Sequence, residues 1–110
     1  MAYRGGFNGF GGGNQMQNLM KQAQKMQEEM QRAQAELEET EVEGSAGGGL
    51  VKVTMTAKKV VTGITINPDA VDTDDITMLE DLIVAALNDG YAKAEKIYGE
   101  KMGAFGGLGL

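Results

Sequence analysis

The chain contains neither cysteine nor histidine among its 110 residues. The absence of cysteine excludes disulfide bonds and thiol chemistry, and the absence of histidine removes the commonest general base and metal ligand of proteins. Catalysis and metal binding are therefore left with few of the side chains that they usually require. We expect the protein not to be an enzyme and to hold no metal or cofactor.

Long apolar runs are also absent, since no stretch of eighteen apolar residues occurs and residues 1–13 lack the apolar segment of a signal peptide. These absences predict a cytoplasmic location without membrane association, and we expect no small-molecule substrate. The length is that of one domain. Because glycine-rich stretches resist a fixed conformation, we predict a single domain at residues 14–103 between flexible tails at residues 1–13 and 104–110.

The net charge of −6 comes from sixteen acidic and ten basic side chains. Binding to a polyanion is driven by lysine and arginine, so the total charge opposes simple attraction to nucleic acid. The distribution is uneven, however, because most acidic residues fall in two clusters, within residues 36–43 and 69–81. Outside these clusters, ten basic side chains face five acidic ones.

A hydrophobic heptad pattern marks the N-terminal third of the chain. Asn14 and Gln17 have the spacing of a capping box, which predicts a helix over about residues 15–39. Such a helix would be about 40 Å long, so we expect part of it to project from a compact body. Its narrow apolar stripe suits pairing with a second helix and predicts a homodimer. This stripe, here called the apolar seam, consists of Met16, Leu19, Ala23, Met26, Met30, Ala33 and Leu37.

Residues 40–67 have the pattern of short strands. Apolar and polar residues alternate over residues 50–57 and again over residues 60–67, where Gly63 is a candidate bulge. A further short strand at residues 40–44 can pair ahead of these two through the glycine-rich turn at residues 44–49. We therefore predict a small antiparallel meander of two or three strands.

A second helix is predicted after Pro68, where Thr77 and Glu80 fit a capping box, and it should end near Gly103. Residues 82–87 are apolar around most of the helix, which indicates cover from two directions. The sheet can cover one side and a second subunit the other. The predicted dimer interface therefore adds three residues of this helix to the seam, namely Leu82, Ile83 and Ala86.

Two apparent binding motifs fail on their spacing. The glycine clusters at residues 11–13 and 47–49 lack the G-x-G-x-x-G pattern, and no Lys-Ser/Thr pair follows them as in a phosphate loop. A calcium loop starting at Asp69 would require glycine at the sixth position, where Asp74 stands. The aspartates of this segment are better explained as helix-capping residues.

Basic side chains occur in two groups that leave two interpretations open. On the first predicted helix they occupy outer heptad positions, so pairing of the seams would leave them exposed. Each group is either a solvated helix surface or a set of contacts to DNA phosphates. The first group is Lys21, Lys25 and Arg32, and the second is Lys93, Lys96 and Lys101. Arg4 and its aromatic neighbours likewise suit either stacking on bases or a tail without a binding role.

Four segments carry a family resemblance when they occur together in this order. They are the heptad helix of residues 14–37, EGSAGGGLVKV at residues 43–53, INP at residues 66–68 and MLEDLIVAALND at residues 78–89. In combination they resemble the YbaB/EbfC family of bacterial nucleoid-associated proteins, over residues 14–103. The aromatic glycine-rich tails lie outside the shared pattern, and Gly90 stands where a small residue that is larger than glycine is common.

The resemblance implies an α+β subunit with a long N-terminal helix, a small antiparallel meander and a long C-terminal helix. It further implies an intertwined homodimer with two projecting helical arms, which binds duplex DNA with little sequence preference and alters its conformation in the nucleoid, affecting nucleoid organisation or gene expression. DNA contacts in the family are thought to lie on the arms, so the resemblance implies phosphate contacts foremost for Lys21, Lys25 and Arg32. The alternative function is a protein-interaction adaptor that acts through the helical arms and has only incidental DNA affinity.

Overall fold

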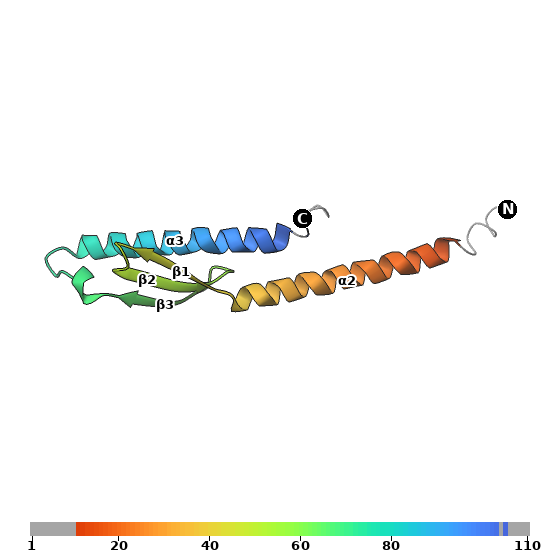
Figure 1. Ribbon diagram of the computed structural model, residues 1–110, viewed down its shortest axis with the longest axis horizontal. Coiled ribbons are helices and arrows are strands. Elements are labelled where there is room, and N and C mark those ends of the chain that lie inside the picture. Colours follow the sequence, from red (N-terminus) through yellow and green to blue (C-terminus); the bar gives the residue numbers. More distant parts are fainter. Residues whose placement is uncertain (1–10, 104, 106–110) are drawn as a thin grey trace. The chain divides into compact units, whose positions relative to one another are not determined.

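The computed structural model describes residues 11–103 and 105, and it confirms the predicted α+β class with two long helices and a three-stranded antiparallel sheet (Figure 1). Neither long helix combines the length and apolar content needed to cross a membrane. The elements in chain order are α2 (Gly11–Glu39), β1 (Glu41–Ala46), β2 (Val51–Thr56), β3 (Val61–Ile66), a 3-10 turn η1 (Pro68–Ala70) and α3 (Ile76–Gly103).

The chain divides into two compact units, and the division falls within α2 between Arg32 and Ala33. The described part of the first unit is entirely helical, and within residues 14–32 no side chain is buried. Helix α2 begins at Gly11, earlier than predicted, so Asn14 lies inside the helix instead of capping it. The second unit contains the end of α2, the sheet and α3.

The sheet is an antiparallel meander in the order β1-β2-β3, as predicted. The turn between β1 and β2 requires a left-handed backbone, since φ is +65° at Gly47, +69° at Gly48 and +96° at Gly49. Glycine adopts these angles without the steric cost that a Cβ atom imposes. The glycine cluster is therefore explained by the geometry of a hairpin.

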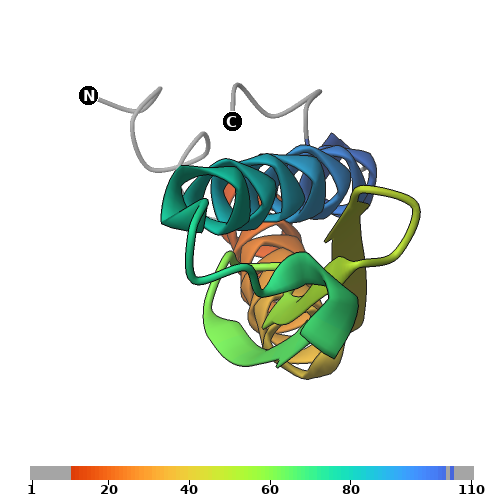
Figure 2. The same ribbon diagram turned by 90° about the vertical axis from the view of Figure 1, so that its left-hand side faces the viewer.

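One face of β2 forms the centre of the core beneath α3 (Figure 2). Val51, Val53 and Met55 alternate along the strand and are each completely buried, which confirms the predicted apolar face. Leu37 from the end of α2 is buried in the same cluster, as is Ala86 of α3. The core thus joins the end of α2, β1, β2 and α3 within the second unit.

Strand β1 and helix α3 approach each other closely at Gly44 and Gly90. A Cβ atom on Gly44 would lie 2.3 Å from the backbone oxygen of Ala86 and 2.4 Å from the nitrogen of Gly90. A Cβ atom on Gly90 would lie 2.5 Å from Cε of Met55. The backbone contacts thus require glycine at position 44, whereas a larger residue at position 90 would require the end of the Met55 side chain to move.

Helix α3 is capped one residue before its start. The Asp75 carboxylate accepts a hydrogen bond from the backbone N–H of Met78 at 3.2 Å, so Asp75 and not the predicted Thr77 acts as the cap. An aspartate at this position satisfies a free N–H group and complements the helix dipole. The helix ends at Gly103, as predicted.

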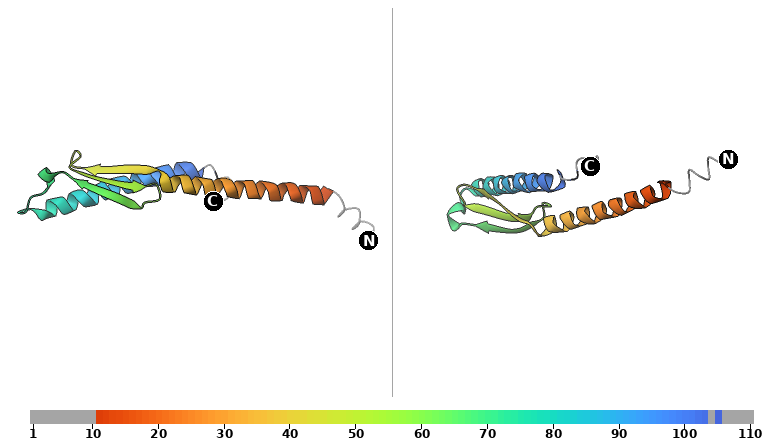
Figure 3. Two further views of the ribbon diagram at one scale, coloured as in Figure 1. Left: turned by 90° about the horizontal axis from the view of Figure 1, so that it is seen from below. Right: turned by 45° about the vertical axis from the view of Figure 1, so that its right-hand side comes forward.

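The apolar face of the sheet is wider than the helix that covers it. The register pairs Val51 with Ile66 and Val53 with Ile64, so these residues share the face that packs against α3. Helix α3 packs mainly on β1 and β2, however, and Ile64 remains 48% exposed. Figure 3 shows the sheet and α3 from two further directions. The extra residue in β3 is Thr62, next to the predicted bulge position.

Candidate nucleic-acid interface

Three basic side chains form one stripe along α2. At about 100° per residue, Lys21, Lys25 and Arg32 lie within about 40° of one another around the helix axis. All three are exposed, and within the part of the chain that the structure describes none of them forms an ion pair. We call these three residues the basic stripe; its cationic groups are available to an external anion.

The apolar seam lies on the side of α2 away from the basic stripe, because its residues are separated from Lys21 by between about 120° and 220° around the axis. In the first unit its side chains are unburied, and Met16 and Leu19 are 62% and 61% exposed. Each side of this part of the helix therefore presents one kind of surface. An association through the seam would leave the basic stripe facing outward.

The end of the heptad behaves differently, because Ala33 and Leu37 are 5% and 1% exposed within a single chain. Ala86 of α3 is also completely buried in the chain's own core. These three side chains were predicted at a dimer interface, but they are already covered by their own subunit. Leu82 and Ile83 are half-buried and still offer surface to a partner.

The lysines of α3 differ from the basic stripe in their surroundings. Lys93 lies 3.1 Å from the Asp89 carboxylate and also donates to the backbone oxygen of Glu43 at 3.1 Å. Lys101 pairs with Glu36. Lys96 has no ion-pair partner among the described residues, and it borders an open groove of about 460 Å³ beside β1. The two predicted basic groups thus differ in ion pairing, because two of the three lysines of α3 have acidic partners.

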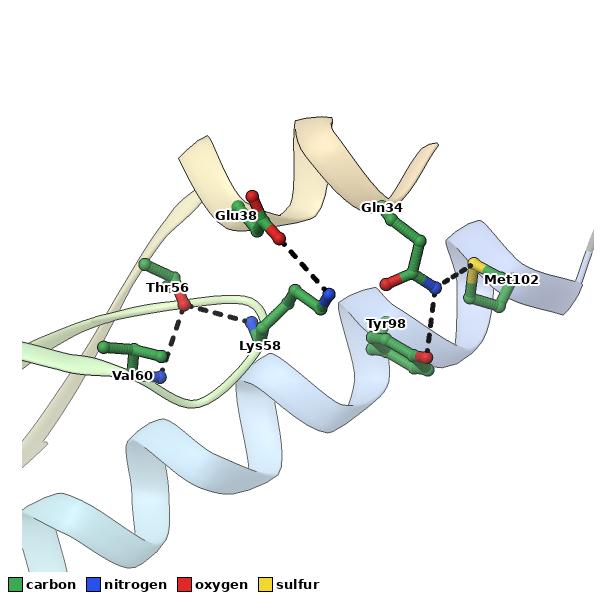
Figure 4. A network of polar contacts seen from close by, with 7 residues as sticks. All are labelled: Gln34, Glu38, Thr56, Lys58, Val60, Tyr98 and Met102. Atoms are coloured by element: carbon green, nitrogen blue, oxygen red, sulfur yellow. Dashed lines mark hydrogen bonds and ion pairs between the residues drawn. The ribbon is translucent and has the colours of Figure 1, made fainter. Parts of the chain in front are cut away.

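Two further lysines, Lys58 and Lys59, follow β2, and both face acidic partners. Lys58 lies 3.5 Å from Glu38, and Lys59 lies 4.0 Å from Glu95. Figure 4 shows the first pair beside the hydrogen bonds that join Gln34 of α2 to Tyr98 and Met102 of α3. The contacts of Lys58 and Gln34 attach the last turns of α2 to the rest of the second unit.

Sequence reasoning did not single out Lys52, which is exposed and has no ion-pair partner among the described residues. It lies on β2 between the buried Val51 and Val53, and therefore on the outer face of the sheet. The alternation that identified the apolar face already contained this information. An isolated lysine on a polar face carries little weight as a binding site.

The acidic segment before α3 is used for local backbone hydrogen bonds. The Asp72 carboxylate accepts from the N–H of Asp74 at 2.9 Å, and Asn67 accepts from the N–H of Asp69 at 2.9 Å. Within the described residues, no group of three acidic side chains is arranged to hold a metal ion. The segment thus shapes the entry into α3.

Charge follows the division between the two units. Residues 1–32 contain four basic and two acidic side chains, whereas residues 33–110 contain six basic and fourteen acidic ones. A polyanion is therefore attracted to the first unit and repelled by the second. The unit with the basic stripe carries the chain's only excess of positive charge.

A comparison with protein families matches residues 12–109 to a model described as the YbaB/EbfC DNA-binding family. The chain belongs to the YbaB/EbfC DNA-binding family. This description names DNA binding and no catalysed reaction, and the match confirms the resemblance found in the sequence.

Relatives of this YbaB/EbfC chain are similar over nearly their whole length. A nucleoid-associated protein of Clostridium botulinum (strain Eklund 17B / Type B) is 60% identical over 105 residues, which cover 94% of this chain and 92% of the relative. A nucleoid-associated protein of Alkaliphilus oremlandii is 52% identical over 107 residues, which cover 97% and 93%.

The fold is also found in a crystal structure of an uncharacterized protein from Helicobacter pylori. The two structures superpose with a TM-score of 0.66, covering 82% of this chain and 92% of the other at 24% sequence identity. The shared architecture is that of the YbaB/EbfC chain described above, with two long helices and a small antiparallel sheet.

Proposed function

We propose that this YbaB/EbfC protein is a homodimeric nucleoid-associated protein that binds duplex DNA with low sequence specificity and alters its conformation. The observation that carries this proposal is the basic stripe, an exposed row of cations that have no ion-pair partner among the described residues, on the more basic unit of an acidic chain. The relatives named above as nucleoid-associated proteins support it. Binding to chromosomal DNA would locate the protein in the nucleoid.

The basic stripe suits the DNA backbone better than the bases. Its three cations extend over about 16 Å of helix axis, and their side chains are exposed along one side. Lysine and arginine in such a row contact phosphates, which fix position without reading sequence. Lys96 is a further candidate contact, whereas Lys93 and Lys101 would first have to leave their acidic partners.

A homodimer is supported by two apolar surfaces that the single chain leaves uncovered. One is the first-unit part of the seam, where Met16 and Leu19 are mostly exposed. The other is the uncovered inner face of β3, which includes Ile64 and Ile66. A soluble monomer rarely exposes contiguous apolar surface of this kind without a partner. We propose that a second copy covers both surfaces.

The DNA proposal is tested by a salt-dependent mobility-shift titration on two unrelated duplexes. A Lys21→Gln/Lys25→Gln/Arg32→Gln variant should lose affinity equally for both duplexes, and its slope of log K against log[salt] should become shallower by about 3 per engaged subunit. The matched control is Lys52→Gln/Lys58→Gln/Lys59→Gln, which removes the same charge from the second unit and should bind much more like the wild type. The dimeric state of each variant is verified first.

A variant that removes a negative charge beside the stripe tests the same proposal through the opposite effect on affinity. Glu28 lies beside the basic stripe, three residues after Lys25 and four before Arg32. Glu28→Gln should therefore bind both duplexes a few-fold more tightly. Salt-insensitive binding, or equal losses in the two triple variants, would contradict the proposal, and no binding even at low salt would favour the adaptor alternative.

The dimer is tested at β3 by sedimentation equilibrium. Ile64→Asp places a charge on the uncovered apolar face and should weaken association strongly, because a carboxylate is costly to bury. Thr65→Asp introduces the same charge at the neighbouring residue, on the opposite face of the strand, and should have little effect. An unchanged mass for Ile64→Asp would exclude this face from the interface.

A further inference from the structure

Strand β1 is one edge of the sheet, so half of its backbone hydrogen-bonding groups point away from β2. The backbone oxygen of Thr40 accepts a hydrogen bond from the N–H of Ala57 at 2.9 Å. Because backbone groups alternate in direction along a strand, the N–H and C=O groups of even-numbered residues point toward β2, and those of odd-numbered residues point away from it. Glu43 and Ser45 therefore point outward. Their groups are those that an added strand would use for its ladder hydrogen bonds.

Two side chains of α3 bind two of these four outward groups. The Asp89 carboxylate accepts from the backbone N–H of Ser45 at 3.0 Å, and the Lys93 ammonium donates to the backbone oxygen of Glu43 at 3.1 Å. The same carboxylate oxygen lies 3.1 Å from the Lys93 ammonium. One ion pair thus satisfies a donor and an acceptor on the open edge of the sheet.

The position of this ion pair depends on the close packing described above. Gly44 lies between the two outward residues of β1, and its contact with Gly90 brings α3 against the strand. Asp89 and Lys93 are one helical turn apart, with the acidic residue first, which is the favourable orientation for such a pair. The helix therefore presents both charges at the spacing of the strand's backbone groups.

The opposite edge of the sheet lacks this protection. Strand β3 contains no charged residue. Within the part of the chain that the structure describes, the only side chain bonded to its backbone is that of Thr54, which belongs to the neighbouring strand β2. Charged groups and covered backbone are the usual means by which proteins prevent a sheet edge from pairing with another chain. The two edges are thus treated differently.

We propose that the Asp89–Lys93 pair closes the β1 edge against strand addition by a second copy of this chain, and so restricts self-association to the other surfaces. Lys93 then acts chiefly within its own subunit. The device does not depend on DNA, so it stands or falls separately from the proposed function.

The test compares amide hydrogen exchange and sedimentation velocity in Lys93→Met, Asp89→Ala and the double variant, without DNA. Lys96→Met is the matched control, since it removes the same charge from the same helix without touching the backbone of β1. In Asp89→Ala the Ser45 amide should exchange about tenfold faster or more. The double variant should form concentration-dependent assemblies larger than those of the wild type and of Lys96→Met.

Thermal unfolding followed by circular dichroism identifies any variant that fails to fold. Lys93→Met retains the apolar stem of an exposed side chain, so it carries the association test if the double variant is unfolded. The proposal would be overturned if the Ser45 amide exchanged in Asp89→Ala at the rate of the wild type. It would also be overturned if no folded variant formed assemblies larger than those of Lys96→Met.

Discussion

Residues 14–32 and residues 33–103 differ in side-chain burial and in the ion pairing of their basic residues. The first segment buries no side chain and exposes a row of cations that are unpaired within the described part of the chain. The second has a core and pairs at least four of its lysines with acidic partners. A side chain tied into a core or an ion pair is less available to an external ligand. The surface that we propose for DNA binding therefore lies in the segment that contributes least to the stability of the subunit.

The largest test of this comparison uses two positions of the same heptad. Leu37→Asp places a charge in the core of the second unit and should destabilise the fold by more than about 4 kcal/mol, enough to unfold a small domain. Met30→Asp lies in the first unit and should cost the monomer less than about 1 kcal/mol, while weakening association. Urea unfolding at low protein concentration and sedimentation equilibrium measure the two effects. A folded, dissociated Leu37→Asp protein would show that the two segments do not differ in this way.

A smaller effect is expected from the glycine contact that fixes the second unit. Gly44→Ala forces a Cβ atom against the backbone of α3 and should destabilise the protein by about 3 kcal/mol. Gly99→Ala is the control, because a Cβ atom there meets nothing within 4 Å and alanine favours a helix, by up to about 1 kcal/mol. Chemical unfolding curves of the two variants should shift in opposite directions, and a shift in the same direction would contradict the close packing of β1 on α3.

The smallest effect concerns the pH dependence of the second unit. The N–H of Ser45, followed by the Lys93 ammonium, holds the pKa of the Asp89 carboxyl below its usual value. A lowered pKa in the folded state contributes stability above the unfolded pKa of about 3.9, and this contribution is lost as the pH falls further through the folded pKa. The stability difference between wild type and Asp89→Asn should therefore shrink between pH 7 and pH 3. A constant difference in urea midpoint would contradict this assignment.

The order of the elements and the apolar face of β2 could be predicted because each depends on a local period in the sequence. The division of the heptad could not, since Met30 and Leu37 occupy the same apolar pattern and only tertiary packing distinguishes them. The exposure of the β3 face could not be predicted for a similar reason. The alternation around Ile64 assigns this residue to one face of the sheet, but it does not show how much of that face the helix covers.

The candidate site was predicted in part. The heptad positions of Lys21 and Lys25 were enough to place them away from the seam, because helical geometry relates nearby residues directly. The partners of Lys93 and Lys101 are the Glu43 backbone, the neighbouring Asp89 and the distant Glu36. Contacts across 50 or more residues depend on the tertiary fold, so the different states of these lysines became visible only in the structure.

All the sulfur of this protein is in its eight methionines, and those that the structure describes differ widely in exposure. Met16 and Met20 are 62% and 63% exposed, whereas Met55 is completely buried. Oxidation converts the apolar thioether into a polar sulfoxide and proceeds first where the sulfur is accessible. An oxidant would therefore reach the seam of α2 well before the core, and its first product would be a folded subunit with an altered pairing surface.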